Sequence, residues 1–500
     1  MSSPRPTLSE LRVVAQPEST IRRASGEHWT GGLYMRHLSI RATRLLIPTR
    51  VSANALTWLM LLTGIGAALV LTVPHLWAAV VTLVLIQFQA LLDCMDGELA
   101  RWRRRTGPIG IYVDRLSPDA GGGFTFADAM IAGLDRYGIG HECVLFYGGR
   151  QRLPDGRTSL PTVHFRAGAA ARWQKIRYGV SRALGRDRGH HLNRSLAAAG
   201  IDFLWMLTPA RFPKLGVPYA FTVWDLAHRE HPYFPEVSTT GWTWDKREAT
   251  YAEMLPRASY VVIGNEVGKE LVRFLYRIPE ERILPIAMPV PKTDVSPSRA
   301  LASTLPRPYL LYPAQFWPHK NHVNAVLALR RAREQYGLDI DLVFTGSDQG
   351  NLAHVHRTVE AEGLTANVHF LGFVEDAELA GLYAGALGLL YLSFFGPDNL
   401  PPLEAFAAGC PVIASATPGH VAQLGNAALF ADPTAPDAIA DRIVRLHSDR
   451  VLRQTLVDNG RAIARERTVE RYLAEVRAAL ARFEPVRRCW PLASQGGDRP

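Results

Sequence analysis

The feature that most constrains this 500-residue sequence is a long stretch without charge: no Asp, Glu, Lys or Arg lies between Arg50 and Asp93. A helix that crosses a bilayer needs about 20 predominantly apolar residues. The stretch has room for two such helices, at residues 54–73 and 76–92, joined by a Pro-His turn. A helical hairpin buried in a soluble core is the alternative. We interpret the stretch as a two-helix transmembrane hairpin.

Basic residues flank both ends of this hairpin. They are Arg36, Arg41, Arg44 and Arg50 on one side and Arg101, Arg103, Arg104 and Arg105 on the other. Because Lys and Arg collect in cytoplasmic segments, both ends, and with them the rest of the chain, are predicted on the cytoplasmic side of the cell (plasma) membrane. Residues 33–49 predict an amphipathic helix on the membrane surface, or alternatively a plain soluble helix. Residues 1–30 are polar, lack periodicity and predict a disordered tail without a signal peptide.

Composition limits the partners. The net charge of +10 favours anionic partners such as phosphates, nucleotide sugars and membrane lipids. No nucleic-acid module is recognisable, so nucleic acid is not an expected partner. The 4 cysteines are far apart and form no C-x-x-C pair, which predicts neither a zinc site nor a disulfide framework and fits a reducing cytoplasm.

Two carboxylates, Asp93 and Asp96, stand at the end of the second predicted span. Their spacing places them on one helix face, and acidic side chains at the end of a membrane helix are costly and usually functional. Two like charges this close need a cation, and oxygen ligands suit Mg²⁺. Gly97 would let a substrate approach closely, and Arg101 is suited to a phosphate.

A longer pattern includes these residues. It reads Asp93-x2-Asp96-Gly97-x2-Ala100-Arg101-x8-Gly110-x3-Asp114. The pattern resembles the signature of the CDP-alcohol phosphatidyltransferases, which implies two metal ions held by four aspartates, with Asp114 as the third ligand. Pro118 stands where that family has the fourth aspartate, and the family has more membrane helices than this chain. Residues 31–108 are therefore predicted to be a truncated unit with a vestigial metal motif, and Mg²⁺ would be needed only if the motif is functional.

The remainder of the chain alternates short apolar runs with helical patterns. Strands are predicted at residues 109–116, 141–148, 202–207, 219–226 and 259–264, then at 308–314, 340–346, 367–372, 387–393 and 411–415. This alternation is typical of parallel, doubly wound sheets. We predict an α/β fold with two Rossmann-like domains at residues 109–290 and 308–484, a linker at 291–307 and a tail at 485–500. Ligands of such a pair bind between the carboxyl ends of the strands.

A glycine-rich turn, SPDAGGG at residues 117–123, joins the first predicted strand to a helical pattern. Strand, glycine loop and helix N-terminus together direct backbone N–H groups at a phosphate, which makes Gly122 and Gly123 donor-binding candidates. An ordinary turn is the alternative. Residues 150–194 are rich in arginine, which suits contact with anionic lipid or a lipid-phosphate acceptor; a solvated helix face is the alternative.

The carboxyl half contains three informative stretches. They are LLYPAQFWPHKNHVNAVLAL (310–329), FLGFVEDAELAGLYAGA (370–386) and FFGPDNLPPLEAFAAGCPVIAS (394–415). In this order, across two α/β halves, they resemble the retaining glycosyltransferases of family 4, which have the two-domain GT-B fold. The resemblance implies transfer from a nucleoside diphosphate sugar with retention of configuration and without a required metal.

The resemblance also implies residue roles. Lys320 falls on the basic residue that contacts the donor diphosphate, and Gln315 falls where many members have Arg. Asn399 and Leu400 lie on the loop whose backbone amides would meet the diphosphate. Glu404 takes the position of a ribose-binding carboxylate, the second Glu of an E-x7-E pattern. The first Glu is replaced, because Gly396 stands at its position.

Catalytic candidates in the amino half follow the strand predicted at residues 219–226. Many relatives place a His before an Asp there, beside the reacting sugar; this chain has Trp224 and Asp225, with His228 three residues on. We predict Asp225 and His228 as the catalytic polar groups. The alternative is that Asp225 caps a turn and His228 is structural.

Three functions compete. The first is a membrane-anchored glycosyltransferase that acts on a lipid-linked or cell-envelope glycan. The second is a Mg²⁺-dependent CDP-alcohol phosphatidyltransferase built on Asp96 and its neighbours. The third is a non-catalytic nucleotide-sugar binder, suggested by Trp224 and Gly396.

Overall fold

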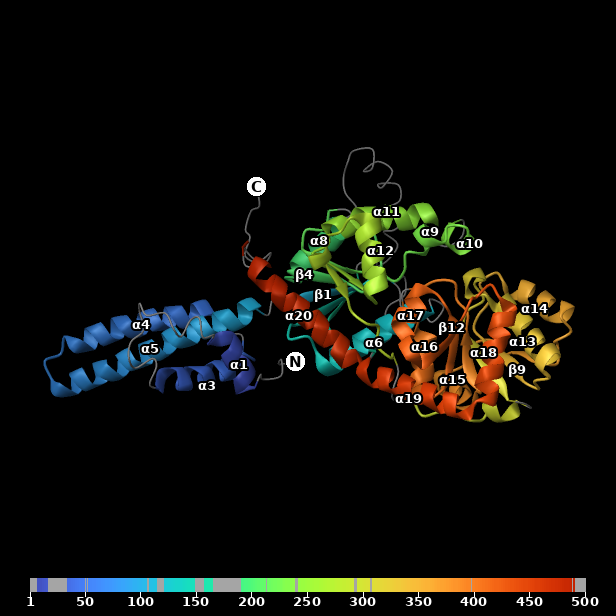
Figure 1. The fold of residues 1–500 in the computed structure, drawn as a ribbon. Coiled ribbons are helices and arrows are strands. Elements are labelled where there is room, and N and C mark those ends of the chain that lie inside the picture. The colour runs from blue at the N-terminus through green and yellow to red at the C-terminus, as the bar shows by residue number, and fades with distance from the viewer. Residues whose placement is uncertain are drawn as a thin grey trace, which may run out of the picture. The chain divides into compact units, whose positions relative to one another are not determined.

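A computed structural model describes residues 7–16, 34–49, 51, 53–105, 108–114, 121–148, 157–164, 190–212, 214–238, 242–291, 295–305, 308–396, 398–487 and 489–490. The chain divides into two compact units (Figure 1). The first, here called the helical unit, comprises Met1–Gly107 and Gly140–Glu142. The second, the α/β unit, comprises Pro108–Ile139 and Cys143–Pro500.

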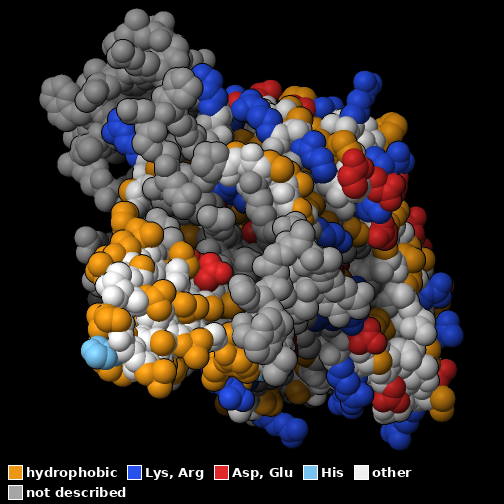
Figure 2. Space-filling view, turned by 90° about the vertical axis from the view of Figure 1, so that its left-hand side faces the viewer, with side chains coloured by type: hydrophobic (Ala, Val, Ile, Leu, Met, Phe, Trp, Pro, Cys, Tyr) orange, Lys and Arg blue, Asp and Glu red, His pale blue; other side chains and the backbone are white. Residues whose placement is uncertain are grey.

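The helical unit contains α1 (Leu8–Ala15), α3 (Arg36–Leu46), α4 (Ala53–Leu71) and α5 (Leu76–Arg105). Helices α4 and α5 pack side by side along their lengths. Many of their apolar side chains face outward, including Leu62 at 62% and Val84 at 62% exposure, and Figure 2 shows hydrophobic side chains gathered on this face. Among the described residues, one helical stretch, Leu76–Asp96, is long and apolar enough to cross a membrane. The apolar part of α4, Trp58–Leu71, is shorter, so the predicted two-helix hairpin is not confirmed.

Helix α1 corrects one prediction. The disorder predicted for residues 1–30 is wrong for Leu8–Ala15, because Leu11 and Ala15 are fully buried against Ile40 of α3. The amide of Gln16 donates to Oε1 of the buried Glu98 at 2.6 Å. Two hydroxyls of α3 donate to the same carboxylate: Ser39 at 2.6 Å and Thr43 at 2.8 Å. A buried carboxylate needs such donors, and here they fix α1 and α3 to α5. The other residues of the predicted tail lie outside the described residues.

The α/β unit contains two parallel sheets. The first has the order β3-β2-β1-β4-β5-β6-β7 in the described residues. Its strands are β1 (Ile109–Val113), β2 (Cys143–Tyr147), β3 (Thr162–His164), β4 (Phe203–Met206), β5 (Tyr219–Thr222), β6 (Tyr260–Ile263) and β7 (Ile283–Pro285). Ile111 of the interior strand β1 pairs in register with Leu145 on one side and Trp205 on the other. Its complete burial explains why this run is continuously apolar.

The second sheet has the order β10-β9-β8-β11-β12-β13. Its strands are β8 (Tyr309–Pro313), β9 (Asp341–Thr345), β10 (Val368–Phe370), β11 (Gly388–Tyr391), β12 (Val412–Ser415) and β13 (Ala428–Ala431). All ten predicted strands are confirmed at their cores. Prediction missed β3 and β7, which are three residues long, and β13, whose sequence ALFA lacks the β-branched residues that mark strands.

Helices cover both sheets. They are α6 (Gly122–Tyr137), α8 (His190–Ala198), α9 (Ala227–Glu230), α10 (Pro235–Ser238), α11 (Trp244–Met254), α12 (Glu266–Tyr276), α13 (His322–Tyr336), α14 (Leu352–Ala361), α15 (Asp376–Gly385), α16 (Leu400–Ala408), α17 (Pro418–Leu424), α18 (Pro436–Ser448), α19 (Arg450–Glu466) and α20 (Val469–Arg487). The predicted pair of Rossmann-like α/β domains is therefore confirmed. Each parallel strand connection uses the crossover that such sheets require.

The last helix, α20, crosses back to the first sheet (Figure 1). Its buried residue Tyr472 stacks on Trp205 of β4 with a centroid separation of 6.2 Å and meets Phe126 of α6 edge-on at 5.6 Å. Near its end, Arg487 donates to the Asp202 carboxylate at 2.6 Å, and both side chains are buried. The sequence-based boundaries placed residues up to 484 in the carboxyl-terminal domain, whereas α20 completes the core of the amino-terminal one.

Shortening a buried side chain of α20 should therefore destabilise the amino-terminal domain. Leu473 is 1% exposed and belongs to that core. We expect Leu473→Ala to lower the free energy of unfolding by about 2–5 kcal/mol, because the lost methyl groups leave a cavity. Arg471→Ala on the solvent side should change it by less than about 0.5 kcal/mol. Urea unfolding of the full chain in detergent measures both, and equal midpoints for the two variants would contradict the packing.

Candidate donor site between the two sheets

The glycine-rich turn lies against side chains from both domains. A Cβ on Gly121 would lie 3.0 Å from Oε1 of Gln315, and one on Gly122 would lie 3.8 Å from Cδ1 of Leu400. A Cβ on Gly123 would lie 2.6 Å from the Trp224 indole. The structure thus brings together four predicted donor-binding residues, Gly122, Gly123, Gln315 and Leu400. They follow the carboxyl ends of β1 and β8 or open α16, where a doubly wound fold places its ligand.

A series of hydrogen-bonded side chains holds Lys320. Its Nζ donates to the Tyr391 hydroxyl at 2.8 Å, and that hydroxyl donates to Oδ1 of Asn399 at 3.0 Å. Nδ2 of Asn399 lies 3.0 Å from Nε2 of His420. Burial, and then the nearby charge of Lys320, lower the pKa of His420 to about 3. His420 is therefore neutral at physiological pH and accepts the Asn399 amide proton. Sequence reasoning missed Tyr391 and His420, because no motif marks them.

Hydrogen bonds from neighbouring residues hold the amino end of α16 in place. Asn399 is the N-cap residue of α16, and its own side chain makes no capping bond. Instead, the backbone N–H of Asn399 donates to Oε1 of Gln423 at 3.0 Å, and Nε2 of Gln423 donates back to the Asn399 carbonyl at 2.8 Å. The first N–H groups of a helix attract anions, and of the first three residues of α16 only Leu400 has one, because Pro401 and Pro402 follow it. Further along α16, Glu404 accepts from the Tyr383 hydroxyl at 2.9 Å.

The structure explains why glycine stands at position 396. Its φ is +126°, a backbone conformation that L side chains rarely adopt. A Cβ there would also lie 2.6 Å from Nδ2 of Asn399. The carboxylate expected at this position is thus excluded by the local backbone and by the Asn399 side chain.

The two catalytic candidates have different surroundings. Oδ1 of Asp225 accepts from Arg247 at 2.7 Å and from the Ala227 backbone at 3.0 Å, and the side chain is 23% exposed. His228 is fully buried, with Nε2 lying 3.2 Å from Glu248 and 3.1 Å from the Tyr276 hydroxyl. Burial lowers the pKa of His228 despite the adjacent carboxylate. This geometry fits a structural role for His228, so the catalytic roles of both residues stay predictions.

The predicted metal ligands fall in different units. Asp93 and Asp96 belong to α5 of the helical unit, together with Gly97 and Arg101. Asp114 follows β1 in the α/β unit, where it accepts from the Tyr112 hydroxyl at 2.9 Å and its N–H donates to Thr208 at 2.7 Å. Within the described ranges, no three His, Cys, Asp or Glu side chains gather to hold a metal. The structure does not test the Mg²⁺ site, which stays a prediction.

The buried carboxylate of Asp398, just before α16, lies against residues of the amino-terminal domain. Oδ1 of Asp398 lies 3.6 Å from Nη1 of Arg467, and Oδ2 accepts from the Met288 backbone at 3.4 Å. A Cβ on Gly264 would lie 1.8 Å from Oδ2. Burial raises the pKa of Asp398 to about 7, and the charge of Arg467 offsets this only in part.

This raised pKa predicts a pH dependence of stability. Because the folded-state pKa lies above the unfolded value, the stabilisation is complete below about pH 4 and is lost as the pH rises towards 7. We expect the wild type to lose about 2–4 kcal/mol relative to Asp398→Asn across this window. Urea unfolding of both proteins at pH 4.5 and pH 8 measures the difference. A constant difference would mean that Asp398 is already ionised at the lower pH.

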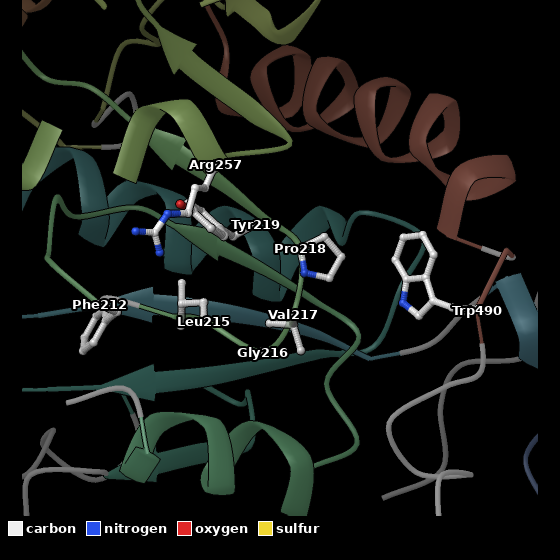
Figure 3. A pocket seen from close by; sticks show the side chains of 8 residues that line it. All are labelled: Phe212, Leu215, Gly216, Val217, Pro218, Tyr219, Arg257 and Trp490. Atoms are coloured by element: carbon white, nitrogen blue, oxygen red, sulfur yellow. The ribbon is translucent and has the colours of Figure 1, made fainter. Parts of the chain in front are cut away.

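A separate hollow of about 370 Å³ is lined by Phe212, Leu215, Gly216, Val217, Pro218, Tyr219, Arg257 and Trp490 (Figure 3). Pro218 precedes β5, so the hollow lies at the amino end of that strand. The donor-binding candidates follow the carboxyl ends of the strands. This hollow is therefore distinct from the site described above.

Comparison with known families agrees with both sequence resemblances. Residues 298–463 match Glycosyl transferases group 1, and residues 50–146 match CDP-alcohol phosphatidyltransferase. The second match continues past α5 into residues that form β1, α6 and most of β2. The chain thus contains one region similar to group 1 glycosyl transferases and another, running into a parallel sheet, similar to CDP-alcohol phosphatidyltransferases.

Individual proteins are similar to parts of the chain. The O-antigen chain mannosyltransferase B of Escherichia coli is 27% identical over 228 residues, covering 44% of this chain and 59% of that protein. The O-antigen chain mannosyltransferase RfbU of Salmonella typhimurium is 28% identical over 177 residues, covering 35% and 48%. The bifunctional IPC transferase and DIPP synthase of Thermococcus kodakarensis is 34% identical over 97 residues, covering 19% and 21%. The chain spans less than two thirds of each relative.

Solved structures resemble the α/β unit in fold. Sucrose-phosphate synthase from Thermosynechococcus elongatus is 19% identical with a TM-score of 0.57, covering 77% of this chain and 98% of that one. Anabaena Alr3699/HepE in complex with UDP and glucose is 15% identical with a TM-score of 0.56, covering 75% and 100%. These likenesses show a GT-B-like pair of α/β domains.

Proposed function

From the group 1 glycosyl transferase domain at residues 298–463, we propose that the protein transfers a sugar from a nucleoside diphosphate sugar to a lipid-linked or cell-envelope glycan, with retention of configuration. The observation that carries this proposal is the grouping of Lys320, Asn399 and the amino end of α16 beside the second sheet. The O-antigen mannosyltransferases among its relatives support the acceptor class. The UDP and glucose complex of Alr3699/HepE supports the donor class.

Charge stabilisation is the chemistry that this grouping supplies. Transfer leaves a nucleoside diphosphate carrying extra negative charge. The Lys320 ammonium, which the Tyr391 hydroxyl holds at 2.8 Å, and the Leu400 N–H at the start of α16 would stabilise that charge. Glu404 would accept from a ribose hydroxyl, and Asp225 would lie beside the reacting sugar. No metal is required in this scheme.

The helical unit would anchor the enzyme. The exposed apolar side chains of α4 and α5 suit a bilayer, and arginines flank them on both sides. We therefore propose a membrane hairpin that keeps both ends, and the α/β unit, in the cytoplasm.

The test is transfer by the full chain in detergent or nanodiscs, with a panel of radiolabelled nucleotide sugars and lipid-linked acceptors. We expect product from one donor, with loss of activity on Glu404→Ala. Retained activity of that variant would contradict the site assignment. Tight nucleotide binding without transfer to any acceptor would instead favour a non-catalytic binder.

A second candidate function follows from the match at residues 50–146. Asp93 and Asp96 on α5 would then bind Mg²⁺ and support transfer from a CDP-alcohol. This function predicts Mg²⁺-dependent release of CMP that is lost on Asp96→Ala. Absence of CMP release from nanodisc-embedded protein would exclude it.

A further inference from the structure

A short segment of the amino-terminal domain reaches the loop that carries Lys320. Glu236 of α10 is buried, and its Oε1 accepts from the backbone N–H of His319 at 3.0 Å and from Nδ1 of the same residue at 2.6 Å. Lys320 is the next residue. One carboxylate of the first domain therefore holds both the backbone and the side chain of a residue in the second domain.

The protonation states are set by burial and by this contact. Burial alone would raise the pKa of Glu236, but the hydrogen bonds from His319 outweigh it and lower the pKa. Burial and then Lys320 lower the pKa of His319 to about 4. At neutral pH an ionised Glu236 thus accepts from a neutral imidazole that carries its proton on Nδ1. Oε2 of Glu236 is buried without a hydrogen-bond partner, an arrangement that costs stability.

Aromatic rings extend the contact to the loop that contains Phe394 and Phe395. Phe395 stacks on His319 with a centroid separation of 4.1 Å and on His231 at 5.6 Å. Phe234 lies 5.5 Å from the Phe394 ring. The His319 carbonyl also accepts from the backbone N–H of Phe394 at 3.0 Å. The segment 231–236 therefore touches both loops that lead into the donor site.

We propose that Glu236 is a positioning residue for sugar transfer: through His319 it fixes the Lys320 loop against the loop at residues 394–399 when the two domains are closed. This inference rests on the proposed function for its role in catalysis. Its structural part, the Glu236–His319 contact, is independent of any reaction. Because Glu236 of the opposite domain holds His319, the position of Lys320 is coupled to domain closure. Such closure completes the catalytic sites of many enzymes.

The experiment compares Glu236→Ala and the isosteric Glu236→Gln with Glu230→Gln, which changes an exposed glutamate at the end of α9. Hydrogen exchange by mass spectrometry reports the His319 amide. We expect Glu236→Ala to lower its protection at least about 10-fold, Glu236→Gln to lower it less, and Glu230→Gln to leave it unchanged. Calorimetry with UDP, GDP and ADP then reports nucleotide affinity, and kcat and KM report transfer.

The outcomes separate the two proposals. A lower kcat in Glu236→Ala, partly restored in Glu236→Gln, with exposure of the His319 amide, supports the positioning role. Exposure of that amide with unchanged kcat and nucleotide affinity overturns it and leaves the proposed function standing. If no donor turns over in the wild type, the proposed function fails, and a weaker nucleotide affinity in Glu236→Ala still supports the positioning of the loop. Unchanged protection in Glu236→Ala overturns the contact itself.

Discussion

Replacing Lys320 by alanine should abolish most sugar transfer. The Lys320 ammonium is half-buried, donates to the Tyr391 hydroxyl at 2.8 Å and lies 5.2 Å from the centroid of that ring. Loss of one preorganised group that stabilises developing charge costs about 10²–10³-fold in kcat. We expect a loss of that size in Lys320→Ala. Initial rates with the preferred nucleotide sugar measure it.

Two further variants make this test specific. Lys320→Met keeps the length of the side chain without its charge, so it should be as impaired as Lys320→Ala if charge is what matters. Lys246→Ala removes an exposed lysine of α11 and should stay within about 2-fold of the wild type. Substantial transfer by Lys320→Met would assign the leaving-group stabilisation to the amino end of α16, with its Leu400 N–H, instead.

The α/β part of the fold was predictable because buried parallel strands leave continuous apolar runs in the sequence. Such a run marks β8 as clearly as it marks β1, and Gly337 after α13 ends a helix in the left-handed conformation that favours glycine. The destination of α20 was not predictable. Its apolar face indicates burial, but nothing in its sequence says which of the two sheets it covers. Tyr472 contacts Trp205 although the two residues are far apart in the sequence.

The site divides in the same way. Lys320 and Glu404 were found because they belong to stretches with recognisable spacing. Their partners Tyr391 and Tyr383 are strand and helix residues whose hydroxyls become informative only when their positions are known. For His228, the position near a strand end suggests a catalytic role, and only the structure shows its buried network with Glu248 and Tyr276.

Adding one methyl group at Gly123 should be almost as damaging as removing Lys320. A Cβ there would lie 2.6 Å from the Trp224 indole, closer than side-chain carbons are found in proteins. The indole is rigid, so either the glycine-rich turn or the Trp224–Asp225 segment must shift. A displacement of about 1 Å in a site can cost about 10²-fold in rate, and we expect Gly123→Ala to lose that much transfer activity.

The neighbouring Gly122 provides a matched control that shows why Gly123→Ala loses activity. A Cβ on Gly122 meets only Leu400 at 3.8 Å, an ordinary contact, and neither Gly122 nor Gly123 has a positive φ. Gly122→Ala should therefore keep transfer within about 3-fold of the wild type. Equal losses in the two variants would mean that the turn needs glycine for close approach of the donor rather than for the Trp224 contact. Full transfer activity in Gly123→Ala would place the reacting sugar away from Trp224. The neighbouring Asp225 would then lose its structural basis as a catalytic candidate.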